Sequence, residues 1–487
     1  MQTTPAHLEV HGSPPPGAFP LCVDLDGTLI RTDLLWESVL LLLRLNPLYA
    51  FLLPVWLMKG RASLKRQISS RVQIDPACLP YNEELLAYLR EQHRAGRPLL
   101  LATASYRDAA EPIALHLGIF SGVVATSGSR NLKGEEKRSL LVQQYGAKGY
   151  DYAGNSSADI AVWKDCNRAI VVNASEGLCR KASAISTLEK IFPRKSGWKA
   201  LPKALRVHQW VKNVLVALPM LTSHQILQPQ LLINALLAFI AFSLCASSVY
   251  VLNDLFDLKS DRLHRAKRNR PFASGDLSIV TGLVMLVVLA LGSVAVSLLL
   301  PRAFQLVLAV YYALTLAYSV SLKQKLLVDV FVLGGLYVLR VMAGGAATSI
   351  VLSPWLLAFC LFFFLSLALV KRYTELRDLQ ENKSAPVAGR GYVAMDLPTI
   401  GAIGTGSGCM CVLVLALYIN SPQVLPLYRS PSVLWFLCPL LLYWISRVWV
   451  MASRGVMNVD PVLFALRDGV SYLTALAGAF IMVLASR

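Results

Sequence analysis

One segment of the chain reads Asn253-Asp-Leu-Phe-Asp-Leu-Lys-Ser-Asp261 and continues through a basic run to Arg270-Pro-Phe-Ala-Ser-Gly275. It lies between two long apolar runs, 231–252 and 279–300. Four polar residues recur at helical spacing, so that one helix would gather their side chains on one flank: Asn253, Asp254, Asp257 and Asp261. Six basic residues lie among and after them: Lys259, Arg262, Arg265, Lys267, Arg268 and Arg270.

This combination of acidic and basic residues favours a site for Mg²⁺ and a diphosphate. Hard divalent cations take carboxylate and phosphate oxygens, and basic side chains stabilise the charge of a departing pyrophosphate. The simpler interpretation is a solvated loop whose charges only set membrane topology. Because the acidic residues recur at helical spacing, we favour the metal site. We expect all four polar residues to be Mg²⁺ ligands, with Asp254 and Asp257 catalytic and Arg270 binding substrate.

The composition indicates an integral membrane protein. The chain has 487 residues, of which 55% are hydrophobic, and its mean hydropathy is +0.52. Several apolar runs approach the ~20 residues that cross a bilayer. We expect about nine spans, at 211–222, 231–252, 278–300, 303–320, 327–348, 354–371, 399–420, 433–452 and 468–486. The net charge of +18 lies largely in loops beside these runs, so it predicts no nucleic-acid partner.

The charges of the loops predict the orientation of the membrane domain. Every second loop, beginning with the one at 253–277, carries many Lys and Arg residues, whereas the opposite loops contain Arg302 and Arg429. Basic loops tend to stay in the cytoplasm. We therefore expect these loops, and the N-terminal region with them, on the cytoplasmic side of the inner membrane. The first 17 residues are polar and proline-rich, which predicts a flexible segment and no signal peptide.

A second motif reads Pro20-Leu-Cys-Val-Asp-Leu-Asp-Gly-Thr28. It predicts a short buried strand that ends in two aspartates. Asp24 at the strand end is placed to attack phosphorus, and Asp26 is placed to protonate the leaving oxygen. The motif resembles the DxDGT signature of the haloacid dehalogenase superfamily, and the other motifs of that superfamily follow in order. The resemblance implies that Thr103 holds the phosphoryl group and that Lys137 neutralises its charge.

The fourth of these motifs departs from the family pattern. In Tyr152-Ala-Gly-Asn-Ser-Ser-Ala-Asp159, Asn155 replaces the usual first metal-binding aspartate. An amide oxygen still ligates Mg²⁺, but with less charge, so we expect weaker metal affinity. The resemblance covers about 18–190 and implies a doubly wound α/β domain. It also implies a Mg²⁺ site whose ligands come from four residues: Asp24, Asp26, Asn155 and Asp159.

Two further segments adjoin this domain. The apolar segment 34–58 is interrupted by Arg44, Asn46 and Pro47, so it cannot comfortably form one spanning helix. It lies where the superfamily carries a helical cap, which we expect around 34–75. Either this cap is an ordinary packed helical hairpin, or it touches the bilayer. The segment 191–205 is basic and contains two prolines, which fits an interfacial linker. The membrane domain would then cover 206–487.

Charged residues also lie near the ends of other predicted spans on the basic side: Lys212, Lys323, Lys371, Arg372, Glu375, Asp460 and Asp468. Arg340 lies inside the fifth predicted span, where a buried arginine is costly unless it meets an anion or a carboxylate. Topology alone explains any one of them, but together they favour a site. With the segment 253–275 and the Tyr318/Lys323 pair, they resemble the UbiA superfamily of intramembrane prenyltransferases over about 200–487. Aromatic prenyltransferases of that superfamily carry a second Asp-rich loop. Here that position reads Lys371-Arg-Tyr-Thr-Glu-Leu376, which is most similar to the decaprenyl-phosphate phosphoribosyltransferase branch.

The resemblance implies that phosphoribosyl pyrophosphate is the donor and that a polyprenyl phosphate is the nucleophile. Two anionic substrates repel each other, so positively charged residues are required in addition to the Mg²⁺ site. Five basic residues would supply them: Lys212, Lys323, Arg340, Lys371 and Arg372. Glu375 belongs to the same expected substrate site.

The sequence thus predicts an α/β domain followed by an all-α polytopic membrane domain in one bifunctional enzyme. The membrane domain would make polyprenyl-phosphoryl-5-phosphoribose, and the α/β domain would remove its 5-phosphate. One alternative is an aromatic prenyltransferase that uses a prenyl diphosphate donor. Another makes the α/β domain a silent sensor or docking module, an interpretation that Asn155 supports. A transporter fits less well, because the polar clusters lie at one membrane face.

Overall fold

The computed structural model describes residues 19–127, 132–194, 197–265, 267–382, 391–422, 424, 427–457 and 460–486. The predicted flexible segment 1–17 lies outside these residues. The chain divides into two compact units. The first unit contains Met1–Leu205 and Tyr250–Leu286, and the second contains Arg206–Val249 and Val287–Arg487.

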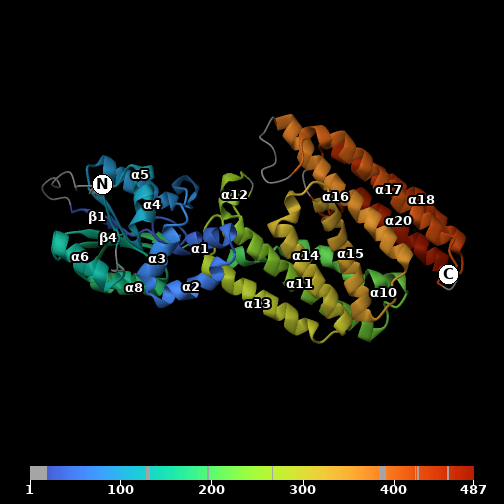
Figure 1. Ribbon diagram of the computed structural model, residues 1–487, viewed down its shortest axis with the longest axis horizontal. Coiled ribbons are helices and arrows are strands. Elements are labelled where there is room, and N and C mark those ends of the chain that lie inside the picture. The colour runs from blue at the N-terminus through green and yellow to red at the C-terminus, as the bar shows by residue number, and fades with distance from the viewer. Residues whose placement is uncertain are drawn as a thin grey trace. The chain divides into compact units, whose positions relative to one another are not determined.

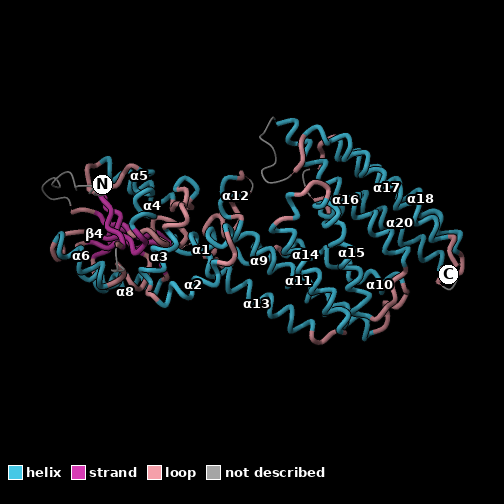
Figure 2. The backbone as a smooth tube through the Cα atoms, viewed as in Figure 1, coloured by secondary structure: helices cyan, strands magenta, loops and turns pink. Residues whose placement is uncertain are grey.

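The first unit is built on a six-stranded parallel sheet, drawn in magenta in Figure 2. Its strand order is β3-β2-β1-β4-β5-β6. The strands are β1 Leu21–Val23, β2 Leu99–Tyr106, β3 Gly122–Thr126, β4 Asp151–Gly154, β5 Arg168–Ala174 and β6 Thr187–Pro193. The helices around them are α4 Glu83–Arg94, α5 Arg107–Leu117, α6 Glu135–Tyr145, α7 Asp159–Asp165 and α8 Glu176–Ile185. In Figure 1, α4 and α5 lie on one side of the sheet and α6 and α8 on the other.

Alternation along the short strand β1 explains why both faces of the sheet are covered. Leu21 and Val23 point into an apolar cluster that includes α4 and α5, whereas Cys22 belongs to the cluster on the opposite face. All three side chains are fully buried. A parallel strand that is buried on both faces reads as a continuous apolar run, as this one does. The prediction of a doubly wound α/β domain is therefore confirmed, and β6 extends it three residues into the segment predicted as a linker.

The cap consists of three helices, α1 Leu34–Leu45, α2 Tyr49–Met58 and α3 Arg61–Ser69. The chain leaves the helical conformation at Asn46, which is the C-cap of α1, and α2 begins three residues later. Val39, Leu42 and Trp56 form a small apolar core with residues of α3. A residue before proline is disfavoured in the helical region, so Asn46 and Pro47 separate the two helices as expected.

The acidic segment also belongs to the first unit. Helix α11, Pro229–Phe256, ends just before Asp257, and the short helix α12, Leu258–Leu263, follows it. The predicted single helix over the four polar residues is therefore interrupted at Asp257. Hydrogen bonds from the Asp257 and Asp261 amides to the carbonyls of Asn253 and Asp257 continue the helical pattern across this turn. Asp254 and Asp261 consequently remain on one side, two helical turns apart.

The second unit is helical. Its elements, with those it shares with the first unit, are η3 Val207–Ala217, α10 Leu218–Thr222, α11 Pro229–Phe256, α13 Ile279–Ser297, α14 Arg302–Val320, η4 Leu322–Gln324, α15 Val328–Thr348, α16 Pro354–Asn382, α17 Leu397–Ile419, η6 Pro431–Phe436, α18 Leu437–Ser453, α19 Pro461–Ala465 and α20 Gly469–Ser486. In the described part of the chain, eight helices are long and apolar enough to cross a membrane. The first of the nine expected spans, at 211–222, instead forms the 3₁₀ segment η3 and the five-residue helix α10.

Close packing explains part of this arrangement. A Cβ atom at Gly344 of α15 would lie 2.0 Å from the carbonyl oxygen of Val216 in η3, so only glycine permits this approach. Gly404 of α17 similarly faces the indole ring of Trp449 in α18. Small residues that bring backbones together are typical of helix packing in membranes.

Gly275 offers a test of the packing around the acidic segment. Its φ is +76°, and an added Cβ would lie 2.8 Å from the carbonyl oxygen of Arg31. Gly118 has a similar φ of +63° but nothing within 4 Å of the added atom. Both alanine variants should lose about 1 kcal/mol from the left-handed backbone. We expect Gly275→Ala to lose at least about 1 kcal/mol more through overpacking. Thermal unfolding of the two purified full-length variants compares them, and equal losses would contradict this account.

Candidate functional sites

The first site lies where three neighbouring strands of the sheet end. Asp24 follows β1, Asn155 follows β4, and Thr103 lies in β2 near its carboxyl end. Since β1 pairs in parallel with both β2 and β4, these ends meet at one edge. The strand order reverses its direction at β1, which is where ligands bind in open α/β sheets.

Asp24 is held by a buried lysine. The Lys137 Nζ lies 2.7 Å from Asp24 Oδ1 and donates a second hydrogen bond, of 2.8 Å, to the Tyr152 hydroxyl. Burial raises the pKa of Asp24 to about 6, although the Lys137 ammonium acts in the opposite direction. Burial lowers the pKa of Lys137, but the charges of Asp24 and Asp159 outweigh it and raise that pKa overall. The site therefore provides a carboxylate nucleophile beside a permanent cation.

Asp26 has different surroundings. Its Oδ1 accepts a 2.7 Å hydrogen bond from the Leu34 amide at the start of α1, and its Oδ2 accepts one of 2.8 Å from the Ser105 hydroxyl. Burial and the charges of Asp33 and Asp24 raise the pKa of Asp26 to about 7. A carboxyl group with this pKa is protonated in about half of the molecules at neutral pH, so it is available as a general acid. The two aspartates thus have environments that suit their two predicted roles.

Asp159 is engaged in hydrogen bonds within the protein. Its Oδ1 accepts a 2.8 Å hydrogen bond from the Tyr152 hydroxyl. Its Oδ2 accepts hydrogen bonds from the backbone amide of Asn155 and from the backbone amide and hydroxyl of Ser156. Thr103 is fully buried, and its hydroxyl oxygen accepts a hydrogen bond from the backbone amide of Ser105. The sequence interpretation missed Tyr152 and Ser105. Both lie in strands next to β1, and that position was the signal available for finding them.

The residues at this edge fit a Mg²⁺ ion by their chemistry. The carboxylate of Asp24 and the side-chain amide of Asn155 offer oxygen atoms, the donors that Mg²⁺ prefers. The Asn155 side chain lies against Gly27 in the turn that follows Asp24, where a Cβ would be 2.1 Å from its Nδ2. A bound ion would neutralise charge on the phosphoryl group.

The second site is formed by the acidic segment. Asp254 and Asp261 are 2% and 3% exposed, and both carboxylates converge on one atom, Nη1 of Arg270, at 3.1 and 2.7 Å. Carboxylate oxygens that meet around one positive centre are also what a divalent cation requires, so these residues fit Mg²⁺. Among the described residues, no three His, Cys, Asp or Glu side chains form a metal-binding group by themselves. Phosphate oxygens would have to complete the coordination, as is usual for Mg²⁺.

The cap helix α1 binds the same segment. Glu37 forms a bidentate ion pair with Arg262, with Nη2–Oε1 and Nη1–Oε2 distances of 2.5 and 3.2 Å. Each side chain is 9% exposed. Arg262 also donates to the carbonyls of Cys78 and Ala273, and Thr32 donates to Glu37. The sequence interpretation missed Glu37, although a lone carboxylate in an apolar segment was a signal that it required a cation.

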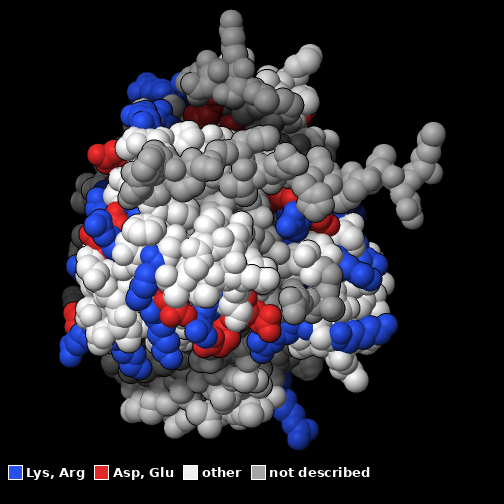
Figure 3. Space-filling model, turned by 90° about the vertical axis from the view of Figure 1, so that its left-hand side faces the viewer, with Lys and Arg blue, Asp and Glu red and all other residues white. Residues whose placement is uncertain are grey.

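Two weaker ion pairs join the same parts of the chain. Asp257 lies 3.9 Å from Nη2 of Arg44, and its side chain is more exposed than that of Asp254. Asp75 and Lys259 lie 3.4 Å apart at the surface. On the face drawn in Figure 3, Lys and Arg side chains are likewise interspersed with Asp and Glu. Such mixed surface pairs contribute little energy. Glu37–Arg262 is therefore the principal ion pair between the cap and the acidic segment.

The third site lies in the second unit. Lys212 of η3 forms a 2.7 Å ion pair with Asp460, and Nζ of Lys371 lies 3.9 Å from the same carboxylate oxygen. The Lys212 ammonium is also 5.8 Å from the centre of the Tyr337 ring. Two predicted phosphate-binding lysines are therefore brought together around one carboxylate. An anion that approached them would meet one net positive charge.

The other predicted basic residues have protein partners. Arg372 is buried and forms ion pairs with Asp329 and Glu375, and its guanidinium lies over the Tyr392 ring. Arg340 is buried, donates to Asn213, Tyr311 and the Leu336 carbonyl, and lies over the rings of Tyr311 and Tyr337. Lys323 lies in η4. The geometry of Arg372 and Arg340 resembles that of structural residues, and their predicted contact with substrate stays a prediction. Asp329 was missed, although a carboxylate inside an apolar run required a cation.

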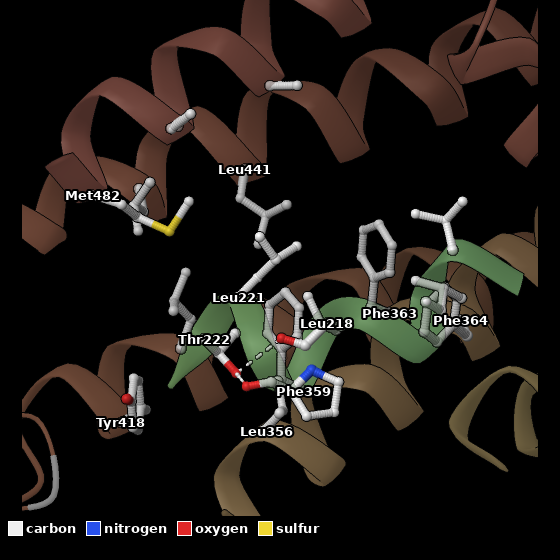
Figure 4. Close-up of a pocket in the computed structure, with 18 of the residues that line it drawn as sticks. Leu218, Leu221, Thr222, Leu356, Phe359, Phe363, Phe364, Tyr418, Leu441 and Met482 are labelled. Atoms are coloured by element: carbon white, nitrogen blue, oxygen red, sulfur yellow. Dashed lines mark hydrogen bonds between the residues drawn. The ribbon is translucent and has the colours of Figure 1, made fainter. Parts of the chain in front are cut away.

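A large apolar pocket adjoins the Lys212 site. Its volume is about 1180 Å³, and Lys212 and Pro461 line it together with many apolar side chains. Figure 4 shows Leu218 and Leu221 of α10 facing Phe359 and Phe363 of α16, with Leu441 and Met482 across the cavity. A concave apolar surface lined by one charged residue, Lys212, suits an amphipathic ligand.

Comparisons with known proteins identify a family for each part of the chain. A model described as the UbiA prenyltransferase family matches residues 214–467, and one described as haloacid dehalogenase-like hydrolase matches residues 21–164. The uncharacterized protein y4nM of Sinorhizobium fredii is 36% identical over 96% of this chain and 91% of its own length. Nodulation protein NoeC of Azorhizobium caulinodans is 37% identical over 58% of this chain and 91% of its own. Decaprenyl-phosphate phosphoribosyltransferase of Mycobacterium tuberculosis is 34% identical over 56% and 90%.

Removal of Glu37 tests the contact between the cap and the acidic segment. Glu37→Ala leaves the buried Arg262 charge without its carboxylate, which should cost about 3–5 kcal/mol. We expect a lower thermal unfolding midpoint and faster trypsin cleavage at the exposed residues Arg265 and Arg268.

Glu176→Ala is the matched control. Glu176 also lies in the first turn of a helix and pairs with an arginine, but its side chain is 93% exposed. Exposed pairs contribute little, so this variant should behave like the native chain. If Glu37→Ala were as stable and as protease-resistant as the control, the pair would not hold the two segments together.

Proposed function

Because the chain belongs to the UbiA prenyltransferase family and carries a haloacid dehalogenase-like domain, we propose that it makes a lipid-linked ribose in two steps. The first step transfers 5-phosphoribose from phosphoribosyl pyrophosphate to a polyprenyl phosphate. The second step removes the 5-phosphate. The observation that carries the proposal is the pair Lys212 and Lys371 around Asp460, beside the large apolar pocket. This arrangement suits an acceptor with an anionic head and an apolar tail.

The donor side of the reaction rests on the acidic segment. Asp254 and Asp261 would hold Mg²⁺, and Arg270 is already within hydrogen-bond distance of both carboxylates. The bound ion would neutralise charge on the diphosphate of the donor. Arg270 would shift from the carboxylates toward the phosphate oxygens when donor and metal enter, because its guanidinium binds either anion in the same way.

The transfer is a substitution at C1 of ribose. The bond between C1 and the pyrophosphate oxygen breaks, and C1 acquires oxocarbenium character. An oxygen of the polyprenyl phosphate forms the new C1–O bond, and the pyrophosphate leaves with its electron pair. The acceptor oxygen is already an anion, so it needs no general base. What it does need is relief from repulsion by the donor, which Lys212 and Lys371 would supply.

The second step uses the edge of the sheet. The carboxylate of Asp24 would attack the 5-phosphate while Asp26 gives its proton to the ribose oxygen that leaves. Water would then release inorganic phosphate from the aspartyl phosphate, with Asp26 accepting a proton. Lys137 neutralises charge at Asp24 and would do so for the phosphoryl group. The product is polyprenyl-phosphoryl ribose, a pentose donor suited to the synthesis of envelope glycans.

The chain is an integral, multi-pass membrane protein. We place both reactions at the cytoplasmic face of the inner membrane, because the basic loops predict that orientation. Soluble phosphorylated sugars are available on that side, and the polyprenyl phosphate is available in the adjoining leaflet.

An aromatic prenyltransferase remains the second candidate, since the Asp254–Arg270–Asp261 arrangement would equally suit a prenyl diphosphate. An aromatic acceptor, however, carries no phosphate head and would not require an excess of cations such as Lys212 and Lys371. In that case the α/β domain would have a regulatory role or be inactive.

The transferase site is tested by Asp254→Asn in the full-length protein. Loss of a ligand and of a buried charge should lower the transfer of labelled ribose to polyprenyl phosphate at least about a hundredfold. Asp276→Asn is the control, because Asp276 lies in the same segment but is exposed. Full transfer by Asp254→Asn would refute the site. Incorporation of label from a prenyl diphosphate, and none from phosphoribosyl pyrophosphate, would establish the second candidate instead.

The phosphatase step is tested by Asp24→Asn. The amide cannot act as nucleophile, so the lipid should retain its 5-phosphate, and mass spectrometry should detect an added phosphate group on the product. Asp108→Asn, a change at an exposed position of α5, should leave the product unchanged. If Asp24→Asn and the native chain gave the same lipid, the α/β domain would have another role. The presence of Asn155 in place of the usual aspartate would then indicate that phosphatase activity has been lost.

A further inference from the structure

The cap helix α2 presents an apolar stripe to the surroundings of the protein. Five exposed residues recur at positions i, i+3, i+4, i+7 and i+10: Leu48, Phe51, Leu52, Val55 and Met58. Phe51 is 76% exposed and Met58 is 88% exposed. Single exposed apolar residues are ordinary, but a contiguous stripe on one helix face marks an interaction surface.

The opposite side of α2 is already used for packing. Tyr49, Leu53 and Trp56 contact the apolar core that α1 and α3 share. The helix is therefore apolar on both sides, whereas a cap helix that faces water would be polar on its outer side. We propose that the outer stripe of α2 lies in the surface of the lipid bilayer.

Contacts at the start of α2 place it beside the end of a spanning helix. Arg44, in the last turn of α1, donates a 2.8 Å hydrogen bond to the carbonyl of Phe256, the last residue of α11. Helix α11 is apolar and long enough to cross the membrane. The chain passes from Arg44 through a short turn directly into α2. The apolar stripe therefore begins at the level where a membrane span ends.

Charges at both ends of α2 fit a lipid surface better than a protein partner. Arg44 precedes the helix, and Lys59 and Arg61 follow it, all of them exposed. Basic residues beside an apolar stripe are typical of helices that lie in the interface of anionic membranes, where each cation gains attraction to the headgroups.

The cap also borders the catalytic edge of the α/β domain. The first amide of α1, that of Leu34, binds Asp26, and Lys65 of α3 donates to the carbonyl of Ala104 in β2. A cap that lies in the bilayer surface would hold this edge near phosphate groups carried by lipids. Resting on the proposed function, this inference specifies its second substrate: the phosphatase site acts on a lipid-linked phosphate at the membrane and disfavours soluble phosphate esters.

Photocrosslinking tests the position of α2 without reference to activity. The full-length protein, with a benzophenone amino acid at Phe51 or Met58, is placed in vesicles of phosphatidylglycerol and phosphatidylethanolamine and irradiated. Both positions should crosslink to lipid, as detected by mass spectrometry. The control is Leu115 of α5, which is also apolar and 69% exposed but carries no such stripe. Equal lipid crosslinking at Leu115, or crosslinks from α2 to a second copy of the chain, would overturn the proposal.

Activity measurements test the consequence for the substrate. In the Val55→Glu/Met58→Glu variant, hydrolysis of the lipid-linked 5-phosphate should fall at least about tenfold, because two apolar side chains no longer enter the bilayer surface. Mg²⁺-dependent hydrolysis of p-nitrophenyl phosphate and transfer of ribose should stay at the native level, which also shows that the variant is folded. Unchanged hydrolysis of the lipid substrate would refute the inferred substrate preference. Absence of both hydrolyses in the native chain would refute the phosphatase proposal and leave the crosslinking result standing.

Discussion

The ion pair between Glu37 and Arg262 joins the cap of the α/β domain to the acidic segment, and both belong to the first unit. Both side chains are almost completely removed from water. A buried pair adds little net stability compared with apolar residues, but removal of one partner is costly. Its effect is therefore to specify one arrangement. With the pair in place, the first residue of α1 binds Asp26 through its backbone amide, and the same helix binds Arg262. The segment that bears Asp254 and Asp261 is thereby fixed to α1.

The three sites handle negative charge in a common way. In each of them a cation is already paired with a carboxylate: Lys137 with Asp24, Arg270 with Asp254 and Asp261, and Lys212 with Asp460. A cation that is paired in the free protein is oriented and does not have to be desolvated when a phosphate arrives. When a phosphate arrives, the cation exchanges its contact with the carboxylate for a similar contact with the phosphate. The sites are therefore preorganised at small cost.

The fold was predictable where local pattern determines it. The apolar strand before Asp24 and the long apolar runs gave the sheet and the spans, because burial depends on composition over short windows. The first span was expected to be short, but the 3₁₀ conformation of η3 was not foreseen, since a stretch of adequate hydropathy does not reveal its helix type. Asp24 and Lys137 were found through motif spacing, whereas the pairing of Lys212 with Asp460 joins residues 248 positions apart. Glu37 and Arg262 are 225 positions apart. No periodicity reports on such contacts.

The same buried pair limits how far the α/β domain is an independent module. A chain that ended after Leu205 would lack the guanidinium of Arg262 that neutralises Glu37. Fusion of the two domains is therefore more than covalent tethering. Residues 250–286 belong to the same compact unit as the α/β domain and supply the cation that neutralises a carboxylate of its cap.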